Sequence, residues 1–412
     1  MDNHHVLFER VVCSGCGLDV HKDNVVATIK GMGIKEETRT FSTFTSSLRE
    51  LSQWLKANGI THIAMESTGV YWKPVHNILD SDFEIILVNA RHIKHVPGHK
   101  TDRKDSAWIA KLLLSGLLKG SFILPRRGRE LRDLYRYKRK LIGQRVSECN
   151  RVQKVLEDAN IKIGSVLSDV FGASGRAMID AIIEGQGDPK VLAELAKGSL
   201  RRKKEQLILA LEGNVTDHHR FMLTISRTAI ANINALIARV DQQIETYLAA
   251  YEEQYRLLQT IPGVQHETTT AIIAEMGTDM SAFPNQHHLA SWAGLCPGNN
   301  ESAGKKKSER ITHGNRSLKT ALVEAAWVAV QNKDTYLKRR YRGLAARRGK
   351  KKALVAIAHK ILTAAYFILK DKVPYQEPDN AAWLEKRKQA LIRSYLKRLH
   401  ELGASAPSQI VK

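Results

Sequence analysis

The sequence is poor in cysteine and lacks long apolar runs, and each shortage excludes a class of protein. Four cysteines in 412 residues are too few for a disulfide scaffold and indicate a reducing cytoplasm. The longest apolar stretch, 353–369, is interrupted by His359 and Lys360, so no membrane span is expected. The first ten residues, MDNHHVLFER, lack the basic and apolar regions of a secretory signal. The lone pair Cys13 and Cys16 makes a poor zinc site, and Cys16 is expected to pack inside a strand.

Acidic residues are also scarce relative to basic ones. The chain has 42 Asp and Glu against 64 Lys and Arg, a net charge of +22, which indicates a polyanionic partner, nucleic acid before membrane. The excess is confined to two stretches, +8 in 126–154 and +17 in 301–412. Such segregation favours an electrostatic footprint over solvated lysine-rich helix faces, although the latter stays open.

Apolar residues are present at an ordinary 43%, which predicts a globular chain, and the length predicts two or three domains. The pattern of elements divides the sequence into four regions. They are an α/β domain over 1–125, a helical and coiled-coil region over 126–250 with an insert at 160–217, a mainly helical domain over 251–370, and a basic tail over 371–412.

The first domain alternates strands and helices in the order βββαβαβα, which predicts an antiparallel meander leading into parallel crossovers. Its expected strands are 16–21, 24–30, 36–41, 61–66 and 83–89, and its expected helices are 45–58, 70–79 and 102–118.

Beyond Pro125 the pattern becomes helical. A long helix is expected over 129–159, and apolar residues at alternating spacings of three and four over 230–247 suit either a helical hairpin or a coiled-coil dimer. Residues 257–277 resemble a helix-hairpin-helix, and an ordinary helical turn is equally compatible. The elements expected next are a polar loop at 296–315, apolar helices at 317–331 and 351–369, and a peripheral helix near 381–400.

Four acids fall at corresponding positions of the first domain. Asp19 lies in the first expected strand and Glu66 ends the fourth, while Asp102 and Asp105 share one face at the start of the last helix. In an RNase-H-like strand order these positions converge, and four carboxylates there would repel one another unless a divalent cation bound them. Singly, each acid could equally cap a turn or complement a helix dipole.

A serine loop in the third domain carries the second candidate group. Ser302 precedes Lys305, Lys306 and Lys307, and these lysines with Arg310 and Arg316 could hold a phosphate beside a hydroxyl nucleophile. No nearby histidine can be named as its base, and His313 is a weak candidate. In the first basic stretch, Arg132, Arg136 and Arg139 are candidate nucleic-acid contacts, and the family resemblance given next implies that they contact RNA.

The motifs together resemble one family, the DEDD transposases of insertion sequences (the IS110 family, bridge-RNA-guided serine recombinases). The likeness covers roughly residues 14–370. The motifs that carry it are GLDVHKD, ESTGVYWKP, VNARHIKHVPGHKTDRKDSAWIA and RELRDLYRY, then LLQTIPGV, FPNQHHLASWAGLCP, ESAGKKKSERITHGN and LKTALVEAAW.

The resemblance implies a RuvC-like first domain and a C-terminal transposase domain. The family's Asp-Glu-Asp-Asp set falls on the four acids named above, as ligands of Mg²⁺ or Mn²⁺, and its catalytic serine falls on Ser302. It further implies a covalent 5′-phosphoserine intermediate, donor and target DNA selected by a non-coding bridge RNA, and composite sites in a homo-oligomer (a dimer, and a tetramer at synapsis). The implied location is the bacterial cytoplasm, at the nucleoid.

Two other functions remain as alternatives. A hydrolytic RuvC-like nuclease, such as a Holliday junction resolvase, would use the four acids and water without a covalent intermediate. A catalytically inactive nucleic-acid-binding protein would need neither the acids nor the serine.

Overall fold

The computed structural model describes residues 12–67, 69–89, 102–298, 300–302, 305–308, 311, 313–332, 335–377 and 381–401. Within these ranges, the side chains of 102–104 and 300–308, and several in the last helix, lie outside the description. The chain divides into two compact units, Met1–Ile123 and Leu124–Lys412.

The first unit is built on a five-stranded mixed sheet in the order β3-β2-β1-β4-β5. The first three strands form an antiparallel meander, and β1, β4 and β5 run parallel to one another. The strands are β1 Ser14–Val20, β2 Asn24–Gly31, β3 Ile34–Ser42, β4 His62–Glu66 and β5 Glu84–Val88.

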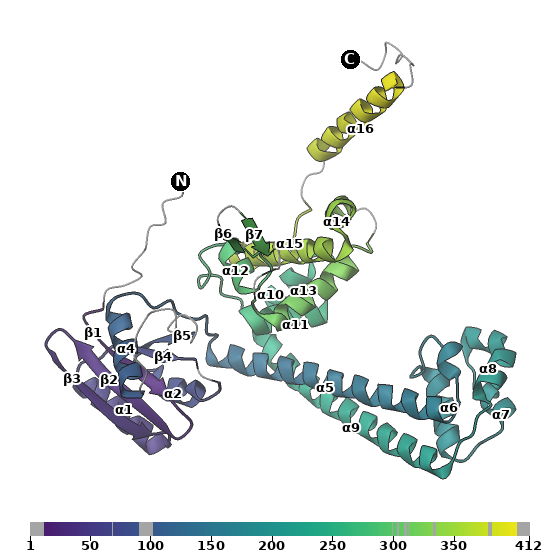
Figure 1. The fold of residues 1–412 in the computed structure, drawn as a ribbon, viewed down its shortest axis with the longest axis horizontal. Coiled ribbons are helices and arrows are strands. Elements are labelled where there is room, and N and C mark those ends of the chain that lie inside the picture. The colour runs from purple at the N-terminus through teal and green to yellow at the C-terminus, as the bar shows by residue number, and fades with distance from the viewer. Residues whose placement is uncertain are drawn as a thin grey trace. The chain divides into compact units, whose positions relative to one another are not determined.

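Helices cover both faces of this sheet (Figure 1). The helices are α1 Thr45–Ala57, α2 Trp72–Leu79 and α4 Asp102–Leu114. One apolar core joins α1 and α2 to strand residues such as Cys16, Leu18 and Ile63. A second, smaller core joins Ile109 and Leu113 of α4 to strands β4 and β5 on the other face. The mixed α/β architecture expected from the sequence is therefore confirmed.

Cys16 is fully buried in the first of these cores, as expected, and burial raises the pKa of its thiol. Cys13 is exposed. The two thiols of the C-x-x-C pair therefore lie in different environments, and Cys16 is a packing residue.

Two helix boundaries differ from the expectation for physical reasons. Helix α2 begins at Trp72 instead of 70. Helix α4 ends at Leu114 instead of 118, because Gly116 takes a positive φ of 64° and its amide closes back on the carbonyl of Leu113. A glycine in the left-handed region is a common helix stop.

The second unit contains a long antiparallel helical hairpin, α5 Arg126–Asp158 and α9 Asp217–Leu248. Polar contacts mark its register at three levels: Tyr247 with Glu130, Lys138 with Asp241, and His219 with Asp158. The apolar seam over 230–247 therefore packs along α5 of the same chain, which is the helical-hairpin alternative. A coiled-coil dimer remains untested.

A small lobe occupies the far end of this hairpin (Figure 1). It is made of α6 Ala173–Ile183, α7 Pro189–Glu194 and α8 Lys204–Leu211, with short 3-10 turns at Ile163–Ser165 and Gly198–Lys203. The lobe has its own apolar core, which includes Leu156 of α5 and Leu223 of α9. The expected insert at 160–217 is thus a packed helical cap on the hairpin.

The remaining helices of the second unit are α10 Glu252–Gln259, α11 His266–Met276, α12 Gln286–Trp292, α13 Arg316–Ala329, α14 Tyr336–Arg348, α15 Lys350–Asp371 and the peripheral α16 Ala381–Glu401. Helices α10, α12, α13 and α14 pack against α15, and α11 packs against α5 and α13. A hairpin of β6 Asn300–Ser302 and β7 Lys305–Ser308 lies where a polar loop was expected. This unit is mainly helical, as expected, and a 3-10 turn at Ala249–Tyr251 links α9 to α10.

Two helical stretches, 217–259 and α15, are long and apolar enough to cross a membrane by length and composition alone. His359 and Lys360 interrupt the apolar run over 353–369 but do not remove α15 from that class. In α15 nine residues are buried against neighbouring helices, and a core helix of this kind satisfies the same length and composition test.

Candidate active site and nucleic-acid interface

The carboxyl ends of β1 and β4 bring two of the predicted acids to adjacent positions. The parallel register pairs Gly17 with Ala64 and Leu18 with Met65. Asp19 and Glu66 come next along the two strands, at the same edge of the sheet. Side chains alternate between the faces of a strand, so Asp19 points to the face of Gly17, which is the face that α4 covers.

Helix α4 runs antiparallel to β1 and approaches it closely, because β1 has glycine at the positions that face the helix. A Cβ at Gly17 would lie 2.1 Å from the carbonyl oxygen of Ser106, and a Cβ at Gly15 would lie 2.6 Å from the Leu113 side chain. The Oγ of Ser106 is 2.7 Å from Oγ1 of Thr28 on β2. Position 106 therefore lies beside position 17, and the N-terminal turn of α4 extends toward the end of β1 that carries Asp19.

Besides Glu66 at the end of β4, the predicted acids are Asp19 on β1 and Asp102 and Asp105 on α4. Asp19 is mostly buried, and its Oδ2 lies 3.1 Å from Nε2 of His21, a neighbour that the motif reading missed. Asp105 is half-buried on α4, and Asp102 is the first residue of that helix, with its side chain outside the described set. Among the described side chains, no three His, Cys, Asp or Glu residues are close enough to hold a metal ion.

Ser302 lies at the turn end of the β6–β7 hairpin. Its backbone pairs with that of Lys305, and Glu301 pairs with Lys306. The side chains of Ser302, Lys305, Lys306 and Lys307 lie outside the described set, and Arg310 lies outside the described residues altogether. Arg316 is exposed at the start of α13, and His313 is exposed before it.

The base of this hairpin is held by close backbone packing. Pro297 and Ile311 form a β-bridge. A Cβ at Gly314 would lie 2.3 Å from the amide nitrogen of Gly294, so only glycine fits there. The Asn315 amide donates to the carbonyl of Trp292 at 3.2 Å, and its Oδ1 accepts from the Leu318 amide to cap α13.

The fully buried Glu275 joins this base to the long hairpin. Its Oε2 accepts a 2.7 Å hydrogen bond from Nδ2 of Asn315, and its two oxygens accept a fork of 2.8 and 2.7 Å bonds from Arg136. Arg132 donates a 2.7 Å bond to the Glu275 carbonyl. Burial alone would raise the pKa of Glu275, but the bonds from Arg136 and Asn315 and the charge of Arg132 outweigh it and hold the pKa below its ordinary value.

The three arginines predicted to contact RNA are therefore engaged inside the chain. Arg132 and Arg136 bind Glu275, and Arg139 pairs with Glu324 of α13 at 3.0 Å. Lys138 of the same helix is buried between Asp241 and Glu267. These contacts give the first basic stretch a structural role in joining α5 to α9, α11 and α13.

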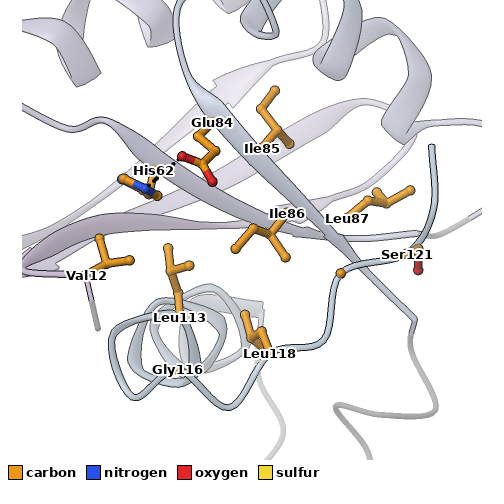
Figure 2. Close-up of a pocket in the computed structure, with 11 residues that line it drawn as sticks. Val12, His62, Glu84, Ile85, Ile86, Leu87, Leu113, Gly116, Leu118 and Ser121 are labelled. Atoms are coloured by element: carbon orange, nitrogen blue, oxygen red, sulfur yellow. Dashed lines mark ion pairs between the residues drawn. The ribbon is translucent and has the colours of Figure 1, made fainter. Parts of the chain in front are cut away.

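A cavity of about 400 Å³ opens in the first unit at the opposite end of β4 from Glu66 (Figure 2). His62 and Glu84 form an ion pair of 3.1 Å at one side, and the remaining wall is mostly apolar, including Ile86, Leu113 and Leu118. None of the predicted catalytic residues lines it, so this cavity is separate from the candidate active site.

Comparison with known proteins matches both units. Residues 16–161 match the model of the DEDD transposases of IS110, described as "Transposase", and residues 255–342 match the "Transposase IS116/IS110/IS902 family". The first range contains the four acids and the second contains Ser302. The capping lobe of α6–α8 lies between the two matched ranges.

Whole-length relatives agree with these matches. The chain is 23% identical over 380 residues to the pilin gene-inverting protein of Moraxella lacunata, covering 88% of this chain and 97% of that protein. It is 26% identical over 302 residues to an uncharacterized 43.6 kDa protein of insertion element IS110 from Streptomyces coelicolor, covering 68% and 73%. The matched family suggests that the chain uses a divalent metal ion, and transposases act on DNA. The chain belongs to the IS110 family of insertion-sequence transposases, enzymes that recombine DNA.

Proposed function

We propose that this transposase cuts and rejoins DNA through two groups, a DEDD carboxylate set and the hydroxyl of Ser302. The carboxylates are Asp19, Glu66, Asp102 and Asp105. The observation that carries the proposal is the shared edge of Asp19 and Glu66 at the ends of parallel strands, with the first turn of α4 held beside it through Gly17. An RNase-H-like identity of the first unit is part of this proposal.

Carboxylate oxygens at one sheet edge suit a hard divalent cation, Mg²⁺ or Mn²⁺. When bound, the ion would neutralise the acids and stabilise charge on phosphoryl oxygens. The chain's own part is to fix the acids on rigid elements. Two adjacent strands hold Asp19 and Glu66, and a helix packed directly on β1 holds Asp105.

The proposed chemical step keeps the energy of the broken phosphodiester bond in a new ester bond between the phosphate and Ser302. The Oγ of Ser302 forms a bond to phosphorus while the bond from phosphorus to the DNA 3′ oxygen breaks. The serine proton passes to a base, and the leaving oxygen takes up a proton to become a 3′-hydroxyl. In the reverse sense, a 3′-hydroxyl from another strand attacks the 5′-phosphoserine and releases Ser302. No nucleotide cofactor is consumed.

Rejoining, rather than hydrolysis, is favoured by the relatives. The Moraxella lacunata relative is named for inverting a pilin gene, and inversion of a DNA segment requires every cut strand to be resealed. We further propose a bridge RNA as guide, composite sites made by two subunits of a dimer, a tetramer at synapsis, and a cytoplasmic, nucleoid-associated location, all on the resemblance to the family.

A trapped adduct tests the serine step. The full chain is incubated with Mg²⁺, RNA transcribed from the element's non-coding flank, and labelled duplex carrying the element's joined ends. Wild type should yield a protein–DNA band that survives denaturation, and Ser302→Ala should yield none. DNA cleavage by Ser302→Ala would instead identify a hydrolytic nuclease. If neither wild type nor Asp102→Asn cleaved the DNA and both bound it equally, the chain would be a binding protein.

A further inference from the structure

Helix α14 and the first turn of α15 form a basic corner. The two helices are joined by the single residue Gly349, at a positive φ of 83°. Nine of the fifteen residues in 338–352 are Lys or Arg, and no Asp or Glu occurs between Asp334 and Asp371. The matched family range ends at 342, so most of this corner lies beyond it.

Among the residues that the structure describes, five exposed cations of this corner lack the carboxylate partners that several cations of α5 have. Arg342, Arg347, Arg348, Lys350 and Lys351 are all exposed. Among the residues that the structure describes, none of these five forms an ion pair with a carboxylate, and Arg347 bonds only to the carbonyl of Gly343. Glu377 accepts a hydrogen bond from the Tyr336 amide at the N-terminal end of α14, away from these five residues.

The corner is rigid, so the cations have a fixed framework. Thr335 caps α14 by accepting from the Lys338 amide, and Leu337 is buried. Lys360 of α15 lies over the Tyr336 ring at 5.8 Å, which ties the two helices together. The Gly349 amide continues the bonding pattern of α14, and its carbonyl starts that of α15.

One exposed face of α14 combines arginines with small residues. Arg342, Gly343, Ala346 and Arg347 follow the helical spacing of one face and are all exposed. A Cβ added at Gly343 would meet nothing within 4 Å. Small residues flanked by arginines allow a phosphate backbone to approach the helix axis closely, and the absence of large apolar side chains from this face disfavours insertion into a membrane.

We propose that α14 and the first turn of α15 bind duplex DNA, with α14 lying in the major groove and its arginines on the flanking phosphates. A B-form major groove, about 12 Å wide, admits an α-helix, whereas the major groove of duplex RNA is too narrow. Single-stranded RNA is usually held by stacking on exposed aromatic rings, which the 342–347 face lacks. The inference rests on DNA as the family's substrate, and it requires neither Ser302 nor the carboxylates.

The test compares two variants of equal charge. In the corner variant, Arg342, Arg347 and Arg348 are replaced by Gln. In the control, Gln replaces Arg220, Arg227 and Arg256, which pair with Asp217, Asp180 and Glu252 elsewhere in the second unit. Binding of the full chain to a labelled 30-base-pair DNA duplex is measured by fluorescence anisotropy in EDTA over a range of salt. Without metal, catalysis cannot contribute, so a missing adduct and a missing contact are distinguishable.

The corner variant should bind at least tenfold more weakly at low salt, and its plot of log K against log salt should be shallower by roughly 2 to 3, from about 0.9 per lost phosphate contact. The control should stay near wild type. Equal binding by the two variants would overturn the proposal, and so would a loss confined to an RNA duplex of the same sequence.

A third variant tests the groove itself. Gly343→Leu keeps every charge, its Cβ would meet nothing within 4 Å, and leucine favours a helix more than glycine does. It should weaken duplex binding by roughly tenfold while leaving the salt slope near its wild-type value, because the slope counts phosphate contacts. Unchanged affinity would overturn the placement of α14 in the groove.

Discussion

Glu275 is a buried carboxylate that holds together three segments far apart in the sequence. Glu275 lies at the end of α11. It accepts hydrogen bonds from Arg132 and Arg136 of α5 and from Asn315 at the base of the β6–β7 hairpin. Removing one partner from a buried ion pair is costly because the opposite charge is left without compensation. The residue therefore fixes the position of the hairpin that carries Ser302 relative to α5.

Glu275→Gln should reduce the free energy of unfolding of the second unit by about 3 kcal/mol at neutral pH. The pKa of Glu275 is lower in the folded chain than its ordinary value of 4.5, so its stabilisation is complete above that value and is lost as the pH falls through the folded-state pKa. Urea unfolding of wild type and variant should therefore converge as the pH is lowered below 4.5. A constant difference at every pH would contradict this.

Glu324→Gln is the matched control for that variant. Glu324 is about half exposed in its pair with Arg139, and exposed pairs contribute at most about 1 kcal/mol. The control should unfold close to wild type at all pH values.

At the scale of elements, the placement of α4 depends on one glycine. Gly17→Ala would bring a methyl group to 2.1 Å from the Ser106 carbonyl oxygen and 2.4 Å from the Ala110 amide, both backbone atoms that cannot move independently of the helix. We expect a loss of roughly 2 kcal/mol or more in the stability of the first unit and a marked drop in adduct yield, because α4 carries Asp102 and Asp105. Gly120→Ala, whose methyl would make only an ordinary contact at 3.6 Å, should leave both unchanged. Thermal unfolding followed by circular dichroism, with the adduct assay, measures the two effects.

Hydrophobic periodicity explains which elements could be predicted. The strands and helices of the first unit, α5, α13 and α15 all have apolar patterns, and each was located within a few residues. Helix α14 was missed because only Leu337 is buried among its residues, so there was no apolar face to detect. The β6–β7 hairpin was missed because its strands are short and polar.

The candidate site also has residues whose neighbours could be predicted from the sequence and residues whose neighbours could not. Asp19 and Glu66 could be placed together because strand order determines which carboxyl ends are neighbours. The partners of Arg132 and Arg136 could not be predicted, since Glu275 lies about 140 residues further along the chain and no local pattern connects them.

For the whole molecule, the net charge of +22 separates into two kinds of basic surface. In the first stretch, Arg132, Arg136, Lys138 and Arg139 are neutralised by carboxylates of α9, α11 and α13, and so stabilise the fold. In the corner at 338–352, the exposed cations Arg342, Arg347, Arg348, Lys350 and Lys351 form no ion pair with a carboxylate among the residues that the structure describes, so their charge is available to a polyanion. A count of charges alone could not separate these cases, because the distinction depends on tertiary pairing.

The division into two compact units predicts how the chain unfolds. Each unit has its own apolar core, the first around Leu18 and Ile63 and the second with separate clusters beyond Leu124. We expect calorimetry to resolve two transitions, because independent cores melt separately. Glu275→Gln should lower the midpoint of one transition by roughly 6 to 12 °C, given about 3 kcal/mol and about 2 to 4 °C per kcal/mol for a unit of this size, while Gly17→Ala should lower only the other. If either variant shifted both transitions together, the two units would be a single cooperative body.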